Sequence, residues 1–266
     1  MFNSRFLKLI LGLSLAWSLP SILRADGVPS DPAKFDVYLL VGQSNMAGRG
    51  ILAPNDKKAD PRILVFDSKN EWVNRGEPVH FDKPVAGVGL GFAFAKCAAD
   101  KRNGVMIGLI PCAVGGTPVK DWQPGAVLFQ NAVQRTQLAL KQGGILKGIL
   151  WHQGEAECRS PELSSAYAHN LTQVIEGFRK AFNTPNVPFI AGELGEYLYT
   201  SKNAPPYARD VNAQIDSLPG LVPNTAVVSS KDLTSNADQL HFNSKSLKEF
   251  GKRYFDALQN LSVKKP

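Results

Sequence analysis

The stretch that decides the fold is FDVYLLVGQSNMAGRG, residues 35–50. Its first half contains a near-continuous apolar run, Val37 to Val41, of the kind that forms a strand buried on both faces of a parallel sheet. The run ends at Gly42, and a second glycine, Gly48, also allows the backbone to turn sharply there. Ser44 then stands at the carboxyl end of a strand, where open α/β sheets bind their ligands. Ser44 is therefore a candidate nucleophile, the alternative being a serine that only caps a helix.

Strand and helix patterns alternate along the rest of the chain. Short apolar runs predict further strands at residues 62–66, 105–110, 145–151, 188–191 and 226–229. Helical periodicity predicts helices at residues 90–101, 126–142, 160–182, 207–217 and 246–258, and residues 67–89 are loop-like. This alternation predicts the fold class α/β: a single three-layer α/β/α sandwich with a mainly parallel sheet of five or six strands.

Residues 1–25 have the pattern of a secretory signal peptide. Arg5 and Lys8 precede or open the apolar run of residues 7–19, and Leu23-Arg24-Ala25 is a passable cleavage site. Pro20 interrupts a run that is too short to span a membrane, which argues against an anchor. We predict that residues 26–266 form a secreted or periplasmic domain without stable membrane association after signal removal.

The charge of the chain argues against a nucleic-acid partner. The 266-residue chain carries 30 basic and 23 acidic residues, and its formal charge of +7 falls to +4 without residues 1–25, which hold three basic residues and no acidic one. The excess is spread along the chain, so we expect no nucleic-acid partner.

No ligand spacing indicates a metal site, and we predict no cofactor. Cys97 and Cys112 form either a disulfide or two thiols, and the oligomeric state is not indicated.

A base for Ser44 has to come from four histidines, because a serine hydroxyl is a poor nucleophile unless a nearby base takes its proton. His241 is best placed, on a turn between the last strand and the last helix. Asp238 lies three residues earlier, a spacing that on a turn brings a carboxylate to the far nitrogen of the ring. We predict that Ser44, Asp238 and His241 are the catalytic residues. The remaining histidines are interpreted as structural or solvated: His80, His152 and His169.

A serine that attacks a carbonyl group also requires hydrogen-bond donors for the oxyanion, each worth roughly 3–4 kcal/mol. The candidates are the backbone N–H of Ser44, the N–H of Gly115 or Gly116 after the predicted strand at 105–110, and the side-chain amide of Gln153. The sequence does not choose between the two glycines, and we assign Gly116 with Gly115 in support. Trp122 follows the same turn and is either a substrate-binding wall or local packing.

Three blocks of residues, in order, resemble those of one enzyme family. The segment Gly42-Gln43-Ser44-Asn45-Met46 resembles its serine block, Trp151-His152-Gln153-Gly154-Glu155 its His-Gln-Gly-Glu block, and Asp238-Gln239-Leu240-His241 its Asp-x-x-His block. Together they span about residues 36–255. The family is that of the sialate O-acetylesterases and acetylxylan esterases, carbohydrate esterases of the SGNH-hydrolase superfamily.

The resemblance implies an SGNH-type topology and a serine esterase that removes O-acetyl groups from an acetylated carbohydrate through an acetyl-serine intermediate. It also implies Gln153 as the third oxyanion donor, and Glu155 is interpreted as a supporting residue that positions Gln153 or the Ser44 turn. Acetylated xylan or a related polysaccharide is the preferred substrate, and O-acetyl sialic acid is the second. A non-catalytic carbohydrate-binding protein and a lipase are the alternatives. A glycosidase pair of Glu155 and Glu157 is disfavoured, because the two are too close for an inverting mechanism.

Overall fold

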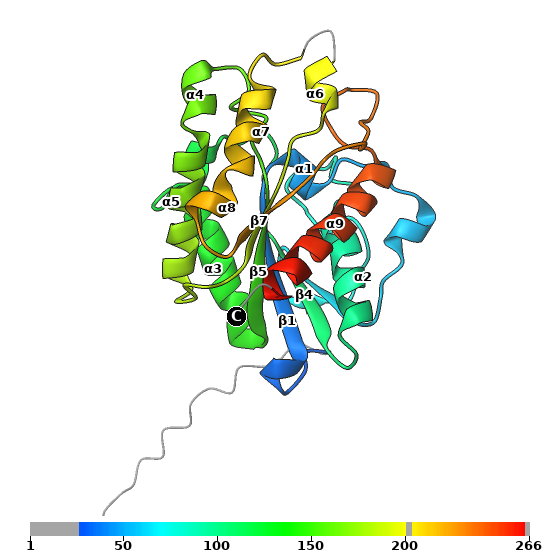
Figure 1. The fold of residues 1–266 in the computed structure, drawn as a ribbon. Helices are drawn as coiled ribbons and strands as arrows, with labels where there is room; N and C mark the ends of the chain where they lie inside the picture. Colours follow the sequence, from blue (N-terminus) through cyan, green and yellow to red (C-terminus); the bar gives the residue numbers. More distant parts are fainter. Residues whose placement is uncertain (1–26, 201–203, 264–266) are drawn as a thin grey trace, which may run out of the picture.

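The computed structural model describes residues 27–200 and 204–263 (Figure 1). At its centre is a seven-stranded sheet in the order β3-β2-β4-β1-β5-β6-β7, in which only β2 and β3 are antiparallel. The strands are β1 (Phe35–Gly42), β2 (Ile63–Phe66), β3 (Trp72–Val73), β4 (Met106–Pro111), β5 (Ile145–His152), β6 (Phe189–Gly192) and β7 (Thr225–Val228). The predicted mainly parallel α/β sandwich is confirmed, with one strand more than the five or six expected.

The additional strand is β3, which lies in the segment expected to be a loop. Trp72 and Val73 pair with Phe66 and Val65 at the edge of the sheet. Two residues are too few to show a period of two, so the sequence pattern does not indicate this strand.

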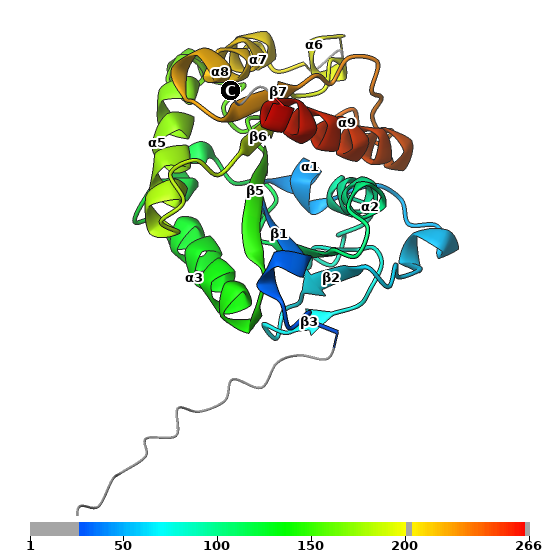
Figure 2. The ribbon, with the colours of Figure 1, turned by 60° about the horizontal axis from the view of Figure 1, so that its bottom comes forward.

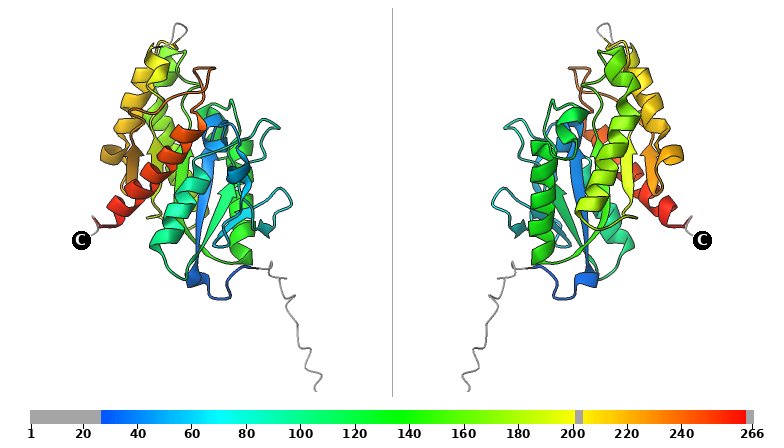
Figure 3. Two further views of the ribbon diagram at one scale, coloured as in Figure 1. Left: turned by 90° about the vertical axis from the view of Figure 1, so that its right-hand side faces the viewer. Right: turned by 90° about the vertical axis from the view of Figure 1, so that its left-hand side faces the viewer.

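Helices cover both faces of the sheet (Figures 2 and 3). One face carries α2 (Gly91–Lys101) and α9 (Ser244–Val263), and the other carries α3 (Val127–Gln142), α5 (Tyr167–Ala181), α7 (Ala208–Asp216) and α8 (Leu218–Leu221). Shorter helices are α1 (Ser44–Ala47), α4 (Pro161–Ser165), α6 (Tyr197–Thr200) and the 3-10 turns at Pro32–Lys34, Pro54–Lys57 and Val119–Trp122. The single helix expected over residues 160–182 is thus two helices, α4 and α5, separated by Ala166.

Strand β1 is the core of the sandwich. All eight of its residues are buried, and their side chains alternate between the two helical layers. Val37, Leu39 and Val41 belong to the cluster beneath α3 and α5, whereas Tyr38 and Leu40 belong to the cluster beneath α2 and α9. The chain builds the sheet first on one side of β1 and then on the other. A crevice for ligands is therefore expected at the carboxyl end of β1, between β4 and β5.

The cysteines are free thiols. Cys97 packs against the core on the α2 and α9 side, and Cys112 packs against the core on the opposite side of the sheet, so the two do not meet. Of the two alternatives left open by the sequence, the structure therefore has thiols.

The predicted signal at residues 1–25 lies outside the described residues. In the part of the chain that is described, no helix combines the length and the apolar character needed to cross a membrane.

Candidate active site

The turn after β1 presents Ser44 at the carboxyl edge of the sheet. Gly42 is paired with His152 at the end of β5, and its φ is +129°. A Cβ at Gly42 would lie 2.1 Å from the His152 carbonyl oxygen, so only glycine allows the two strands to approach this closely. The Gln43 N–H donates to the same carbonyl at 2.9 Å, and helix α1 then begins at Ser44 itself.

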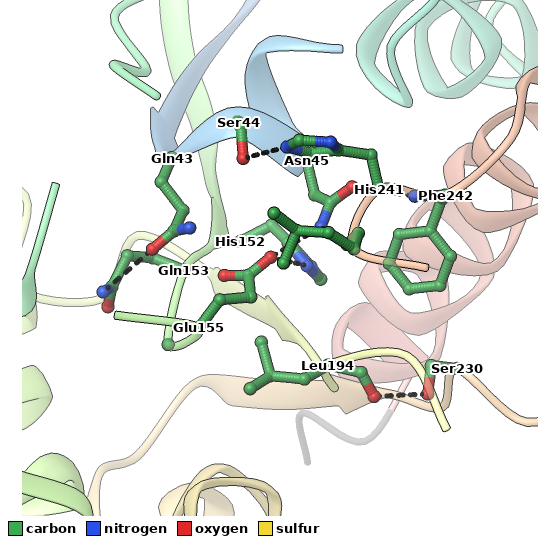
Figure 4. A network of polar contacts seen from close by, with 12 residues as sticks. Gln43, Ser44, Asn45, His152, Gln153, Glu155, Leu194, Ser230, His241 and Phe242 are labelled. Carbon is green, nitrogen blue, oxygen red and sulfur yellow. Dashed lines mark hydrogen bonds and ion pairs between the residues drawn. The ribbon is translucent and has the colours of Figure 1, made fainter. Parts of the chain in front are cut away.

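Ser44, His241 and Asp238 form a continuous hydrogen-bonded relay. The His241 Nε2 lies 3.0 Å from the Ser44 Oγ, and the His241 Nδ1 lies 2.7 Å from the Asp238 Oδ2 (Figure 4 shows the first contact). Because a carboxylate only accepts, Nδ1 carries the ring hydrogen and Nε2 is free to accept the Ser44 hydroxyl hydrogen. The structure thus brings together the three residues that the sequence singled out, although 197 positions separate Ser44 from His241.

Asp238 is held as an ionised carboxylate. Burial alone would raise its pKa, but the backbone N–H groups of His241 and Leu240, each 3.0 Å from Oδ1, and the His241 ring outweigh burial and lower the pKa. A negative charge at this position orients the His241 ring and stabilises the imidazolium form.

The other three histidines do not reach Ser44. His80 is buried, and desolvation lowers its pKa to about 4. His152 is fully buried, with ring contacts to Phe242 and Phe250. His169 is exposed on α5, 3.3 Å from the side chain of Gln173. Their interpretation as structural or solvated residues is confirmed.

Asn45, a residue for which the sequence predicts no role, connects the His241 loop to the Ser44 turn through hydrogen bonds (Figure 4). Its Nδ2 donates to the Leu240 carbonyl at 3.3 Å, and its Oδ1 accepts from the Phe242 N–H at 3.0 Å. These are the two neighbours of His241, so one side chain next to the nucleophile fixes the chain on both sides of the base. We call Asn45 with these two bonds the Asn45 clasp.

Glu155 supports the Asn45 clasp. Its Oε1 accepts from the Asn45 Nδ2 at 2.6 Å and lies 3.7 Å from the His152 Nε2. Burial alone would raise the pKa of Glu155, but the neighbouring His152 ring and the Asn45 amide outweigh burial and lower it. Of its two expected supporting roles, Glu155 therefore has the one at the Ser44 turn, because its side chain bonds Asn45 and not Gln153.

Glu157 is separated from Glu155 by its own set of partners. Its Oε1 accepts from the Val119 N–H at 2.7 Å and its Oε2 from the Gln153 amide at 2.5 Å. Burial raises the pKa of Glu157 to about 7. Both oxygens point into the protein, so Glu155 and Glu157 do not form a pair of carboxyl groups that faces a glycosidic bond.

The structure distinguishes between the two candidate glycines. The Gly115 N–H donates to the Asp82 Oδ2 at 2.9 Å and is therefore occupied. Neither the Gly116 N–H nor the Ser44 N–H has a hydrogen-bond acceptor within residues 27–200 and 204–263. Gly116 has a φ of +86°, and an added Cβ would meet nothing within 4 Å, so this peptide faces open space.

The Gly115–Gly116 turn is held by two residues of the loop before α2. Asp82 binds the Gly115 N–H and forms a 2.6 Å ion pair with Arg49, and the Lys83 Nζ donates to the Gly115 carbonyl at 2.9 Å. Burial alone would raise the pKa of Asp82, but the Arg49 guanidinium and the Gly115 N–H outweigh burial and lower it. These contacts could not be predicted from the sequence, because the loop has no periodic pattern.

The assignment of Gln153 as an oxyanion donor needs correction, and the choice left open for Trp122 is decided. Gln153 is 0% exposed and does not line the cavity beside Ser44, because its amide is bonded to Glu157. Trp122 is also 0% exposed; its Nε1 donates to the Thr117 Oγ1 at 3.1 Å, and its ring packs edge-on against Trp151. Trp122 is therefore core packing and not a wall for the substrate.

A cavity of about 630 Å³ opens beside Ser44. Its lining includes Gln43, Gly116, Arg159, Leu240 and His241. The volume falls in the range of small-molecule sites, which is roughly 300–1,000 Å³. Within the described residues, no group of three or more His, Cys, Asp or Glu side chains is placed to hold a metal ion.

Comparisons with known proteins agree with this architecture. The family model for carbohydrate esterases of the sialic acid-specific acetylesterase type matches residues 34–260. A probable carbohydrate esterase of Arabidopsis thaliana is 30% identical over 237 residues, 81% of this chain and 86% of that protein. The crystal structure of that Arabidopsis protein has a TM-score of 0.77 at 29% identity, covering 85% of this chain and 98% of the other.

Two more distant structures share the fold. NanS is 16% identical, with coverages of 88% and 99% and a TM-score of 0.70. A carbohydrate acetylesterase from Xanthomonas citri is 19% identical, with coverages of 86% and 57% and a TM-score of 0.64. This chain belongs to the sialic acid-specific acetylesterase family of carbohydrate esterases, and it is therefore classed with the carboxylic ester hydrolases.

Proposed function

We propose that this protein hydrolyses O-acetyl esters on carbohydrates, with Ser44 as nucleophile, His241 as general base and acid, and Asp238 as the group that orients His241. The observation that carries the proposal is the relay at the edge of the cavity, in which Ser44 Oγ lies 3.0 Å from His241 Nε2. A serine with a base in reach is needed for covalent catalysis, whereas a binding module has no use for it.

The reaction proceeds in two steps. The Ser44 oxygen attacks the acetyl carbonyl carbon while its proton passes to the His241 Nε2. The bond between that carbon and the sugar oxygen then breaks, and His241 gives the proton to the leaving sugar oxygen, which becomes a hydroxyl group. Water attacks the acetyl-serine in the same way, giving its proton to His241, and acetate leaves as the Ser44 hydroxyl is restored.

Negative charge on the acetyl oxygen is met by donors that have no other partner. The N–H groups of Ser44 and Gly116 are both unbonded within the described ranges and lie on residues that line the cavity. Each such donor contributes roughly 3–4 kcal/mol to the stability of the transition state. No metal or organic cofactor takes part in this mechanism.

The substrate that we propose first is acetylated xylan or a related polysaccharide of plants or algae. The proposal rests on the compact single domain and on the predicted export signal at residues 1–25, because an exported esterase meets polymeric carbohydrate outside the cell. Export would be tested by expression with residues 1–25 present: the mature protein outside the cytoplasm should begin at residue 26. A cytoplasmic product that retains Met1 would refute export.

A second candidate substrate is an O-acetylated sialic acid, and Arg159 is the observation that favours it. Arg159 is exposed, lines the cavity that contains Ser44, and has no ion-pair partner among the residues described. A guanidinium there matches the carboxylate of a sialic acid, which neutral xylose units lack. Acetate release from both substrates, compared for wild type and Arg159→Ala, separates the two. Loss of activity only on the sialic acid would favour the second candidate.

The esterase activity is tested with an aryl acetate and with acetylated xylan. Ser44→Ala should abolish acetate release from both while the thermal unfolding curve stays close to that of the wild type. Near-wild-type turnover in this variant would refute the proposal. A wild-type protein that binds acetylated carbohydrate without releasing acetate would instead be a binding protein, and preference for long acyl chains would indicate a lipase.

A further inference from the structure

The NH2 group of the Gln153 side chain is engaged away from the cavity. Its Nε2 has two hydrogens and three acceptors: the Glu157 Oε2 at 2.5 Å, the Thr117 carbonyl at 3.2 Å and the Gln43 Oε1 at 3.3 Å. The Thr117 carbonyl fixes the orientation of this amide, because a carbonyl only accepts and the Gln153 oxygen would face it if the amide were turned round. With no hydrogen left to donate and no exposed surface, Gln153 does not reach an oxyanion on Ser44.

Gln43 presents the free amide instead. Its Oε1 accepts from Gln153, which fixes the orientation of the group and leaves the Nε2 hydrogens on the other side. Figure 4 shows the Gln43 side chain beside Ser44, with its oxygen toward Gln153 and its nitrogen turned away from it. No acceptor for this nitrogen occurs among the described residues, and Gln43 lines the same cavity as Ser44.

The orientation of Gln43 is anchored deep in the protein. Gln153 is held by Glu157, whose other oxygen is fixed by the Val119 N–H at 2.7 Å. At the near end, the backbone of Gln43 is tied to the His152 carbonyl at the end of β5. A chain of buried hydrogen bonds therefore holds one neutral amide in a fixed orientation at the cavity that contains Ser44. Preorganised donors of this kind stabilise developing charge most effectively.

We propose that Gln43 supplies the third oxyanion donor, next to the N–H groups of Ser44 and Gly116, and that Gln153 is a positioning residue acting through Gln43. The inference rests on the proposed esterase mechanism. No covalent bond to Gln43 forms: its N–H donates to the acetyl oxygen as that oxygen gains negative charge, and the hydrogen bond weakens again when the sugar leaves.

The test is a double-mutant cycle on kcat and KM with an aryl acetate. Gln43→Met keeps the length of the side chain but removes the donor, and it should lower kcat by about 10²–10³-fold with little change in KM. Gln153→Met should lower kcat less, and the double variant should lose no more than Gln43→Met alone, because Gln153 acts only through Gln43.

The rate of Ser44 modification by an organophosphonate gives a second readout, since its tetrahedral product carries an oxygen in the same place. This rate should fall in Gln43→Met in parallel with kcat, while the thermal unfolding curve stays close to that of the wild type, whereas a purely structural role would change the unfolding curve as well. A kcat within threefold of wild type in Gln43→Met, with a large loss in Gln153→Met, would overturn the inference and return the role to Gln153. Absence of esterase activity in the wild type would contradict the proposed function itself, so the two failures are distinguishable.

Discussion

Replacing Asn45 by alanine should damage activity far more than its position outside the relay would indicate. The Asn45 clasp bonds the residues on both sides of His241, through the Leu240 carbonyl and the Phe242 N–H. Without these two hydrogen bonds, fewer contacts hold His241 in position beside Ser44. A misplacement of about 1 Å in such a group costs roughly 10²-fold in rate. We therefore expect kcat of Asn45→Ala to fall about a hundredfold with little change in KM.

The same substitution should lower the free energy of unfolding. It leaves the buried Phe242 N–H without an acceptor, at a cost of about 1–3 kcal/mol, and it removes a hydrogen bond to the ionised Glu155, worth about 1.5–3 kcal/mol. Together these give roughly 3–5 kcal/mol. Denaturant unfolding measures this loss, and aryl-acetate turnover measures kcat at a temperature at which the variant is folded.

Asn212 offers a matched control. It is also buried, and its side chain bonds the N–H and the carbonyl of Leu194, at 2.7 and 3.0 Å, away from Ser44 and His241. Asn212→Ala should lose a comparable free energy of unfolding but keep kcat. Equal losses of kcat in both variants, or a normal kcat in Asn45→Ala, would refute the positioning role of Asn45.

Three further predictions follow from buried groups. Burial raises the pKa of Glu77 from 4.5 to about 7, so the folded state binds this proton more tightly than the unfolded state. The resulting contribution to stability is complete below pH 4.5 and is lost as the pH rises to about 7. Glu77→Gln should therefore flatten the fall in unfolding free energy over this pH range, and an unchanged slope would contradict the raised pKa of Glu77. Asp82→Ala leaves Arg49 without its ion-pair partner and the Gly115 N–H without its acceptor. The variant should lose about 3–5 kcal/mol of stability, and its kcat should fall by at least about tenfold. A stable variant with normal kcat would show that the Gly115–Gly116 turn does not need Asp82. Trp122→Phe should lower stability by about 1–2 kcal/mol without changing KM for acetylated sugars, whereas a raised KM would restore Trp122 to the substrate site.

The sequence predicts the part of the site that depends on local pattern. The apolar run ending at Gly42 predicts where Ser44 stands, because the end of a buried parallel strand fixes the edge of the sheet at which it appears. Asp238 and His241 could be paired from the sequence because they lie three positions apart, and on a turn this spacing brings the Asp238 carboxylate to the His241 ring. The approach of this turn to Ser44 could not be derived from periodicity; the family resemblance supplied it.

The parts that the sequence could not predict depend on contacts between distant segments. Gln43 and Gln153 are both amides after strand ends, and only the buried acceptor Glu157 determines which of them faces inward. The Asn45 clasp also depends on distant contacts, with Leu240 and Phe242. In the sequence, an asparagine after a candidate serine cannot be distinguished from an ordinary turn residue. Trp122 was open between packing and substrate contact because an indole in a loop is compatible with both.

The most direct test is to trap the acyl-enzyme. The protein is mixed with an aryl acetate, quenched with acid during turnover, digested and analysed by mass spectrometry. The mechanism predicts one acetyl group on the peptide that contains Ser44, and none in Ser44→Ala. Continued acetate release without acetylation of Ser44, or with the acetyl group on another residue, would contradict the assignment of Ser44 as the nucleophile.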